Sequence, residues 1–345
     1  MSCPTVNELP SPPSGKIGWP WTEGAPPLSV LMPDGLPWPR VSVVTPSFNQ
    51  AQFLEETIRS VLLQGYPNLE YFVMDGGSTD GSAQIIRKYA PWLAEWVSEK
   101  DKGQSDAINK GLSRASGSIL AWLNSDDVYL PGCVSEIVSA FNRFADAGMI
   151  YGNIAVIDED SKKLAVLPHQ TWAFSHQLTQ KIIISQQGAF WRRVVMDSIG
   201  MLRDDLHYTM DFEFWIRIGR RYKIVGLNCV LAQYRISSVS KTETQFAGWG
   251  PEFIKILDDL YAEAELAPEI VSLRRKAYAN AYYGGARGFL IPDALKARVW
   301  LWKAVSYDPY IIFLTGWWQM YVRTLLGRRI YGWCRLVMRK LRRSR

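Results

Sequence analysis

Apolar runs alternate with segments of helical periodicity after a proline-rich start. The run at 41–47, "VSVVTPS", has the uninterrupted apolar character of a buried strand. The next segment carries apolar residues at helical spacing from Leu54 to Leu62 and then reaches Gly65, a residue type that commonly ends helices. A strand followed by a helix is therefore predicted here.

The same alternation continues to about residue 124. Strands are predicted at 70–77 ("EYFVMDGG"), 95–101 ("EWVSEKD") and 118–124 ("SILAWLN"), and helices at 82–90 ("SAQIIRKYA") and 105–117 ("SDAINKGLSRASG"), the last with Ser105 as its N-cap. Short strands that alternate with helices indicate an α/β domain with a mostly parallel central sheet. In such a sheet the loops at the carboxyl ends of the strands form the ligand site.

Three further helices are predicted near the carboxyl terminus, at 252–266, 269–290 and 294–309. Together these patterns predict four parts, which are a Pro/Trp-rich N-terminal arm at 1–39, an α/β domain at 40–241, a helical accessory region at 242–309 and a basic amphipathic tail at 310–345.

The N-terminal arm has an unusual composition. Ten of the 19 prolines precede residue 40, and Trp19, Trp21 and Trp38 lie among them. This composition is typical of an extended, irregular segment. Because tryptophan side chains are costly to leave in water, we expect the arm to pack along the surface of the domain that follows.

The positive charge is concentrated at one end of the chain. The 345 residues are 48% hydrophobic, which is enough for a sizeable core, and carry a formal net charge of +6. From Tyr310 to Arg345 there are nine Lys/Arg and no Asp/Glu, which leaves 30 basic and 33 acidic residues elsewhere. The body of the protein is therefore slightly acidic, and a nucleic-acid partner is not expected.

The cysteines and the apolar segments bear on the compartment. The four cysteines form no metal-binding or disulfide spacing, which is typical of reduced thiols in a cytosolic protein. The first residues lack the apolar core of a signal peptide, and no segment offers 18 apolar residues free of charge. A cytoplasmic protein that does not span a membrane is therefore expected.

Polar side chains follow each of the three main strands. Thr45 and Ser47 end the first strand, Asp75 ends the second, and Asp126 and Asp127 follow the third. A solvated turn would explain the adjacent aspartates taken alone. At the mouth of a crevice, however, two carboxylates repel each other unless a cation lies near them, and oxygen ligands suit Mg²⁺ or Mn²⁺. The glycine-rich segment after Asp75 lacks both GxGxxG and GK[ST], which disfavours a dinucleotide fold and a P-loop.

Two long segments together carry a family resemblance. "VSVVTPSFNQAQFLEETIRSVLLQGYPNLEYFVMDGGSTDGS" and "SEKDKGQSDAINKGLSRASGSILAWLNSDDVYLPG" resemble the family 2 glycosyltransferases, which have a GT-A nucleotide-sugar-binding fold. The resemblance covers roughly residues 40–241. It implies an inverting, metal-dependent, hexosyltransferase-type enzyme that moves a sugar from a nucleotide-diphosphate sugar, expected to be UDP-linked, to an acceptor hydroxyl.

The resemblance also assigns roles residue by residue. It implies that the nucleotide base and ribose are held by Thr45, Pro46 and Asp75, and that the donor pocket is lined by Asp106, Gln187 and Gly188. Asp127 is implied as the preferred direct ligand of Mn²⁺ or Mg²⁺, with Asp126 beside it, near the ribose or a metal-bound water. Asp211 is implied as the catalytic base. Two positions depart from the family pattern, because Gly76 replaces a second aspartate and Met210 replaces the usual glutamate before Asp211.

Some of these residues have simpler explanations. Asp106 and Asp211 also suit the first turn of a helix, where a carboxylate is favoured by the helix dipole. Lys241, in "YRISSVSKT", is a candidate partner of the diphosphate, although an exposed lysine is the common alternative. A protein that retains the fold as a nucleotide-sugar-binding or scaffolding module without catalysis is the alternative function.

The tail predicts a location. Tryptophans, tyrosines and leucines alternate with its nine basic residues, which is typical of a helix that lies in the interface of an anionic membrane. Contact with a partner protein or a nucleic acid, or a solvated tail, are the alternatives. We expect a peripheral enzyme on the cytoplasmic face of a bacterial inner membrane, with a saccharide or lipid-linked saccharide acceptor used in cell-surface polysaccharide or glycan assembly.

Overall fold

The computed structural model describes residues 3–168, 171–179, 184–237 and 246–325. It divides the chain into two compact units. The first comprises Met1–Phe174 and Ile182–Ser237, and the second comprises Ser175–Lys181 and Ser238–Arg345.

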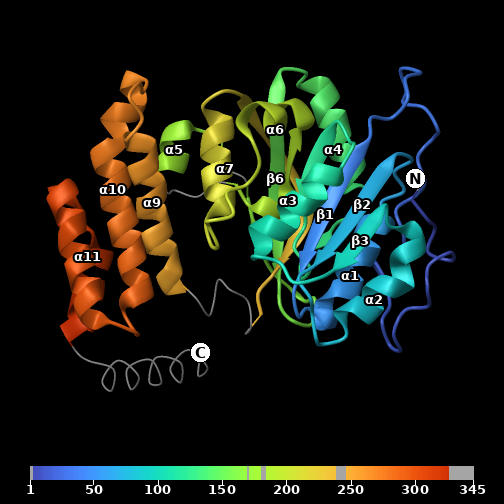
Figure 1. The fold of residues 1–345 in the computed structure, drawn as a ribbon, viewed down its shortest axis with the longest axis horizontal. Helices are drawn as coiled ribbons and strands as arrows, with labels where there is room; N and C mark the ends of the chain where they lie inside the picture. Colours follow the sequence, from blue (N-terminus) through green and yellow to red (C-terminus); the bar gives the residue numbers. More distant parts are fainter. Residues whose placement is uncertain (1–2, 169–170, 180–183, 238–245, 326–345) are drawn as a thin grey trace. The chain divides into compact units, whose positions relative to one another are not determined.

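Four parallel strands form the first half of the sheet in the first unit. Their order is β3 (Glu95–Ser98), β2 (Leu69–Asp75), β1 (Val41–Ser47) and β4 (Ile119–Trp122), and every pair is parallel. All four therefore end at the same edge of the sheet, and Figure 1 shows β1, β2 and β3 side by side. The predicted α/β fold is confirmed here.

The second half of the sheet is mixed rather than parallel. It continues from β4 through β8 (Ala189–Arg192), β6 (Ala147–Ile157), β9 (Lys223–Arg235) and β5 (Val128–Tyr129), with β7 (Lys163–Leu167) paired to β6. Among the described strands of this half, β6 and β9 are the parallel pair, and the other pairs are antiparallel. The alternation of strands and helices that predicted parallel pairing stops after β4, and the later strands connect differently.

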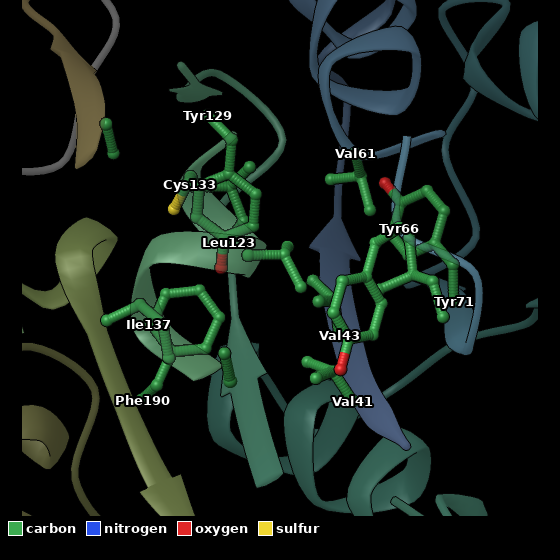
Figure 2. Close-up of a cluster of buried hydrophobic side chains, with 14 of the residues drawn as sticks. Val41, Val43, Val61, Tyr66, Tyr71, Leu123, Tyr129, Cys133, Ile137 and Phe190 are labelled. Carbon is green, nitrogen blue, oxygen red and sulfur yellow. The ribbon is translucent and has the colours of Figure 1, made fainter. Parts of the chain in front are cut away.

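Helices cover both faces of the sheet because successive strand residues point to opposite sides. Val41 and Val43 of β1 face α1 (Ala51–Leu62), α2 (Ser82–Tyr89) and α4 (Cys133–Arg143), and Figure 2 shows part of this core. Val44, the next residue of β1, points to the other face of the sheet, which is covered by α3 (Gln104–Arg114), α6 (Arg193–Ile199) and α7 (Met210–Gly219). Short 3-10 helices lie at Ala90–Trp92 (η1) and Gln186–Gly188 (η2).

The N-cap of helix α3 lies two residues earlier than expected. Its N-cap is Gly103, with φ of 122°, and Ser105 lies inside the helix instead of capping it. The buried Ser105 hydroxyl donates to the Leu206 carbonyl at 3.1 Å. The expected N-cap is therefore wrong, because a glycine can adopt the left-handed backbone that this turn requires.

The N-terminal arm packs on α1 through one arginine. Arg59 is fully buried and donates to the carbonyls of Pro10, Pro20 and Trp21 at 2.7 to 2.9 Å. Its guanidinium also lies 5.7 Å from the centre of the Trp21 ring. With the Tyr89 hydroxyl, which accepts from Nη1 at 3.1 Å, the arm carbonyls give each nitrogen of the buried guanidinium at least one acceptor.

Helices make up the described part of the second unit. They are α9 (Trp249–Tyr261), α10 (Pro268–Phe289), α11 (Ala294–Tyr307) and a further helical segment at 315–325, with short 3-10 helices at Phe246–Gly248 (η3) and Pro309–Phe313 (η4). Helix α5 (Phe174–Leu178) lies where the chain passes between the units. Trp300 of α11 packs edge-on against Tyr282 and Phe289 of α10. None of the helices within the described residues has the length and apolar character needed to cross a membrane.

Candidate functional site

The end of β1 lies at the edge where the parallel strands terminate. Thr45 and Pro46 are both buried, and the Thr45 hydroxyl oxygen accepts a hydrogen bond from Tyr71 at 2.9 Å. The side chain of Thr45 thus belongs to the core. The Ser47 hydroxyl, two residues further, is buried and has no hydrogen-bond partner among the described residues. An unpaired buried hydroxyl at a strand end is a group that a ligand can satisfy.

Asp75 ends β2 and organises the neighbouring loops. Its carboxylate is buried and accepts hydrogen bonds from the Ser78 N–H at 2.9 Å, from the Ser78 hydroxyl and from the Ser98 hydroxyl at 2.7 Å. The carboxylate therefore joins the loop after β2 to the end of β3. Its predicted contact with the nucleotide stays a prediction.

Gly76 leaves room for a different carboxylate. A Cβ atom at Gly76 would lie 2.5 Å from Oδ2 of Asp101, which is too close for any side chain unless Asp101 moves. The other oxygen of Asp101 accepts from the Gly103 N–H at 2.9 Å. Asp101 thus brings a carboxylate beside the position where the sequence lacks one. The sequence did not single out Asp101, because the pattern placed it at the end of the predicted strand 95–101, whereas β3 ends at Ser98 and Asp101 lies in the loop that follows.

Asp106 lies in the first turn of α3. It accepts a hydrogen bond from the Lys102 N–H at 3.0 Å and pairs with Lys110 at 3.3 Å. Partial burial alone would raise the pKa of Asp106, but these two contacts lower it below its ordinary value. These contacts are typical of a carboxylate in the first turn of a helix. The predicted place of Asp106 in the donor pocket stays a prediction.

Asp127 points into the protein. The side chain has no exposed surface, and its Oδ1 accepts from the backbone N–H of Arg235 at 3.0 Å. Its Oδ2 accepts from the Gln187 side chain at 3.0 Å and from the Asn124 side chain at 3.3 Å. Burial, together with the adjacent Asp126, raises the pKa of Asp127 well above its ordinary value. Asp127 thus connects the loop after β4 with η2 and with the end of β9.

Asp126 is the more accessible of the two adjacent carboxylates. It is partly exposed, and burial still raises the pKa of its carboxyl group above the ordinary value. Its backbone carbonyl accepts from Nε of Arg235 at 2.9 Å, which holds the loop in place. Geometry therefore favours Asp126 over Asp127 for direct contact with a cation or ligand.

A polar network connects four elements at this edge. Gln104, at the start of α3, donates to Oδ1 of Asn124 at 2.8 Å, and Asn124 in turn donates to Asp127. Gln187 of η2 reaches the same carboxylate, and Gly188 follows it with its backbone packed against Gly152. The predicted residues Asp127 and Gln187 are thus in direct contact, although 60 residues separate them.

Arg235 is a second residue that our sequence reasoning missed. It is fully buried at the end of β9, and Nη2 pairs with Glu56 of α1 at 2.9 Å. Its Nη1 donates to the Asp158 carbonyl and to the Ser161 hydroxyl, each at 2.9 Å, in the turn between β6 and β7. Since Arg235 also holds the Asp126 carbonyl and its N–H holds Asp127, it fixes the position of both aspartates. Nothing in "QYRISS" signalled this role.

Asp211 lies in the first turn of α7. It is partly exposed, and Oδ1 accepts from the Phe212 N–H at 2.7 Å, whereas Met210 beside it is buried. The loop before α7 is attached to α3, because Leu202 exchanges hydrogen bonds with the Asn109 side chain at 2.8 and 3.1 Å. The loop before Asp211 is therefore hydrogen-bonded to α3, the helix whose first residue, Gln104, belongs to the polar network. Its role as a base is untested.

Asp126 offers a partly exposed carboxylate to a cation. No group of three or more His, Cys, Asp or Glu residues suited to a metal ion occurs within the part of the chain that the structure describes. A cation at Asp126 would thus complete its coordination with water and substrate oxygens, which is how Mg²⁺ is commonly bound beside phosphates. The residues present fit such an ion. Lys241 and residues 326–345 lie outside the described residues.

Comparisons with known proteins show the family of the chain. The family model described as "Glycosyl transferase family 2" matches residues 42–202. A protein of Mycobacterium tuberculosis described as "Uncharacterized glycosyltransferase" is 30% identical over 218 residues, which are 61% of this chain and 81% of the relative.

Solved structures share the fold at low sequence identity. S. aureus TarS, residues 1–349, superposes with a TM-score of 0.59 at 16% identity, over 79% of this chain and 82% of that one. TarS has also been solved with UDP-GlcNAc. The mannosyltransferase PcManGT of Pyrobaculum calidifontis, in complex with GDP-Man and Mn²⁺, superposes with a TM-score of 0.56 at 17% identity, over 83% and 84% of the two chains.

Proposed function

Since the chain belongs to glycosyltransferase family 2, we propose that it is an inverting, hexosyltransferase-type enzyme that moves a sugar from a nucleotide-diphosphate sugar to an acceptor hydroxyl. The observation that carries this proposal is the polar network at the strand ends. In this network Asp126 is partly exposed, whereas Asp127 is buried and hydrogen-bonded to Gln187 and to the Arg235 N–H. Such preorganisation suits a site that must bind a diphosphate in one orientation.

The donor would lie along the carboxyl edge of the sheet. In this proposal the backbone around Thr45 and Pro46 and the loop organised by Asp75 hold the base and ribose, with Asp106 lining the pocket. Gln187 and Gly188 lie on the sugar side. A UDP-linked sugar is the proposed donor, and the UDP-GlcNAc complex of TarS, which shares the fold, supports the class of ligand.

A divalent cation, Mn²⁺ or Mg²⁺, is the proposed cofactor. Asp126 would hold it, and Asp127 would hold the loop rather than the ion, because three donors already occupy the two oxygens of Asp127. This reverses the order expected from the sequence. When bound, such a cation supplies charge neutralisation for the departing diphosphate. The Mn²⁺ complex of PcManGT supports a divalent ion in this fold.

Asp211 is the proposed base. Its carboxylate would remove the proton from the acceptor hydroxyl, and the resulting oxygen would attack the anomeric carbon while the bond to the diphosphate breaks. Attack opposite the leaving group, without a covalent intermediate, inverts the configuration at that carbon. The buried Met210 stands at the position where the family pattern places a glutamate beside this aspartate.

We further propose that the acceptor is a saccharide or lipid-linked saccharide of bacterial cell-surface polysaccharide or glycan assembly. The enzyme would act in the cytoplasm, peripherally bound to the inner membrane. The support is the basic, aromatic composition of residues 310–345.

A thermal-shift screen tests the proposed donor site. UDP-, GDP- and dTDP-sugars are each added with and without Mn²⁺, and the melting temperature of the protein is measured. We expect one nucleotide class to raise the melting temperature, and to do so more strongly with Mn²⁺, because a ligand that binds only the folded state stabilises it. If no nucleotide sugar changes the melting temperature, the proposed donor site is wrong.

A non-catalytic nucleotide-sugar-binding protein of the same fold is the second candidate. The observation that favours it is the buried Met210 in place of the usual acid before Asp211. Slow, metal-dependent hydrolysis of the donor separates the two candidates. An active transferase should release nucleotide in the presence of Mn²⁺, whereas a binding module should bind the donor and leave it intact.

A further inference from the structure

Helix α11 presents an apolar stripe to solvent. Its buried residues pack toward α10, as Trp300 does against Tyr282. On another side of the helix Leu295, Val299 and Trp302 follow one another at i, i+4 and i+7, and Leu295 is 67% exposed. Residues at this spacing share one helical face.

A second stripe lies on the helical residues 315–325. Trp317 and Met320 are buried there, whereas Trp318, Val322 and Leu325 repeat the same i, i+4 and i+7 spacing and are about half exposed. Surface helices of soluble proteins normally place polar residues at such positions. Two adjacent helical segments in one unit thus expose large apolar side chains in register with the helix period.

Aromatic contacts join the two stripes. The Trp302 ring lies 5.3 Å from Trp317 and 6.0 Å from Tyr321, and Tyr321 lies 6.2 Å from Trp318. Phe313, in η4 between the two helices, is 80% exposed. We refer to the exposed residues of both stripes as the apolar face of the second unit, which comprises Leu295, Val299, Trp302, Trp318, Val322 and Leu325.

Positive charge accompanies this face. Lys296 and Lys303 are exposed on α11, and Arg323 is exposed on the helical segment 315–325. The chain from Tyr310 to Arg345 contains nine Lys/Arg and no Asp/Glu. Asp308, whose carboxylate accepts from the Tyr310 N–H, is the one acidic residue in the sequence after residue 293.

We infer that the apolar face of the second unit docks on the surface of an anionic lipid bilayer. Tryptophan and aliphatic side chains enter the boundary between headgroups and acyl chains, and lysine and arginine side chains attract anionic headgroups. This inference deepens the membrane association proposed above by placing part of the contact on α11, outside the basic tail. It requires no catalytic step, so it stands or fails independently of glycosyl transfer.

Vesicle sedimentation of the full-length protein tests the inference. Vesicles of phosphatidylcholine alone are compared with vesicles of equal parts phosphatidylcholine and phosphatidylglycerol. The test variant is Val299→Glu combined with Val322→Glu, which places one carboxylate in each stripe. The matched control is Val194→Glu, because Val194 is equally exposed but lies on α6 in the first unit.

We expect the wild-type protein and the Val194→Glu control to sediment with the anionic vesicles and to remain in solution with the neutral ones. The double variant should lose about tenfold or more in apparent binding to anionic vesicles, because each substitution removes an apolar contact and adds a repelled charge. Its melting temperature should match that of the control, since both sites are exposed.

Two outcomes would overturn the inference. One is a wild-type protein that does not bind anionic vesicles, and the other is a double variant that binds them as the wild type does. If in either case sedimentation velocity shows that the double variant dissociates an oligomer, the face is a contact between protein chains instead. Donor hydrolysis measured without lipid on the same samples keeps a failure of the proposed enzymatic function separate from a failure of docking.

Discussion

Asp126 and Asp127 are adjacent residues in different environments. Asp127 accepts hydrogen bonds from three elements and has no exposed surface, whereas Asp126 remains partly exposed at the strand edge. The electrostatic repulsion between the two neighbouring carboxylates is reduced here because Arg235 contributes its buried positive charge and two hydrogen bonds to this loop. Asp127 is thus suited to stabilising the loop, and Asp126 is suited to binding a ligand.

Asparagine substitutions should separate these two roles. We expect Asp126→Asn to remove the extra stabilisation that Mn²⁺ gives in the presence of a nucleotide sugar, with little change in the free energy of unfolding. We expect Asp127→Asn to lower the free energy of unfolding by about 1–3 kcal/mol, because an amide cannot accept from all three donors. Urea denaturation and thermal shifts with Mn²⁺ measure the two effects. Equal effects of the two substitutions would contradict the assignment.

Asp211 can be tested without knowledge of its exact geometry. Asp211→Asn should lower the rate of sugar transfer or donor hydrolysis by about 10²-fold or more, while the donor still raises the melting temperature. The rate loss follows because an amide cannot remove a proton. Asp204→Asn, at an exposed site in the loop before α7, is the matched control. A nearly normal rate in Asp211→Asn would exclude Asp211 as the base.

Hydrogen bonds at the opposite edge of the sheet connect β1, β2 and β4. Glu70 of β2 accepts from the Ser42 hydroxyl of β1 at 2.6 Å and from both the N–H and the hydroxyl of Ser116, just before β4, at 2.6 and 2.8 Å. Burial alone would raise the pKa of Glu70, but these hydrogen bonds and Arg40 hold it below its ordinary value. The three strands are thus fastened at their amino ends by one ionised carboxylate.

The lowered pKa of Glu70 gives a pH dependence with a defined sign. Because the folded pKa lies below the unfolded value of about 4.3, ionised Glu70 stabilises the fold above that pH, and the contribution is lost as the pH falls through the folded pKa. Glu70→Gln should lower the free energy of unfolding by about 1–2 kcal/mol at neutral pH, and by progressively less on acidification.

Urea denaturation at a series of pH values from neutral to acidic measures this difference. Glu23→Gln, at an exposed position in the N-terminal arm, is the control and should show no such pH-dependent gap. A constant difference between Glu70→Gln and wild type across the series would show that the ionised carboxylate is not the stabilising group.

The two units of the molecule divide the proposed tasks. Every contact of the polar network, from Gln104 through Asn124 and Asp127 to Gln187, lies within the first unit. The apolar face lies entirely within the second. A fold arranged in this way can bind a donor with one unit and a surface with the other.

Hydrogen exchange with and without donor and Mn²⁺ tests this division. We expect slower amide exchange at the strand ends of the first unit, because a bound donor suppresses local opening there. The amides of α10 and α11 should exchange at unchanged rates without lipid. The opposite result, with protection confined to the second unit, would show that the donor site is misplaced. The segments expected to be protected are 45–49, 75–80, 101–107, 124–127 and 186–188.

The parallel strands and their helices were predictable because their signals are local. The apolar run of β1 and the helical spacing after it depend only on neighbouring residues, and so does the polar end of each strand. The N-cap of α3 was not predictable from the apolar pattern, because the choice between Gly103 and Ser105 depends on backbone conformation. The mixed half of the sheet was also missed, because strand direction there depends on long connections.

The local pattern of the chain was enough to predict that a strand ends at Asp126 and Asp127, at an edge shared with the other polar strand ends. Which of the two aspartates faces solvent depends on contacts between distant segments. The partners of Asp127 are Gln187 and Arg235, which lie 60 and 108 residues away along the chain. Asp101 likewise reaches Gly76 only after β3 pairs with β2. Contacts of this kind form when distant segments pack together, so no local pattern records them.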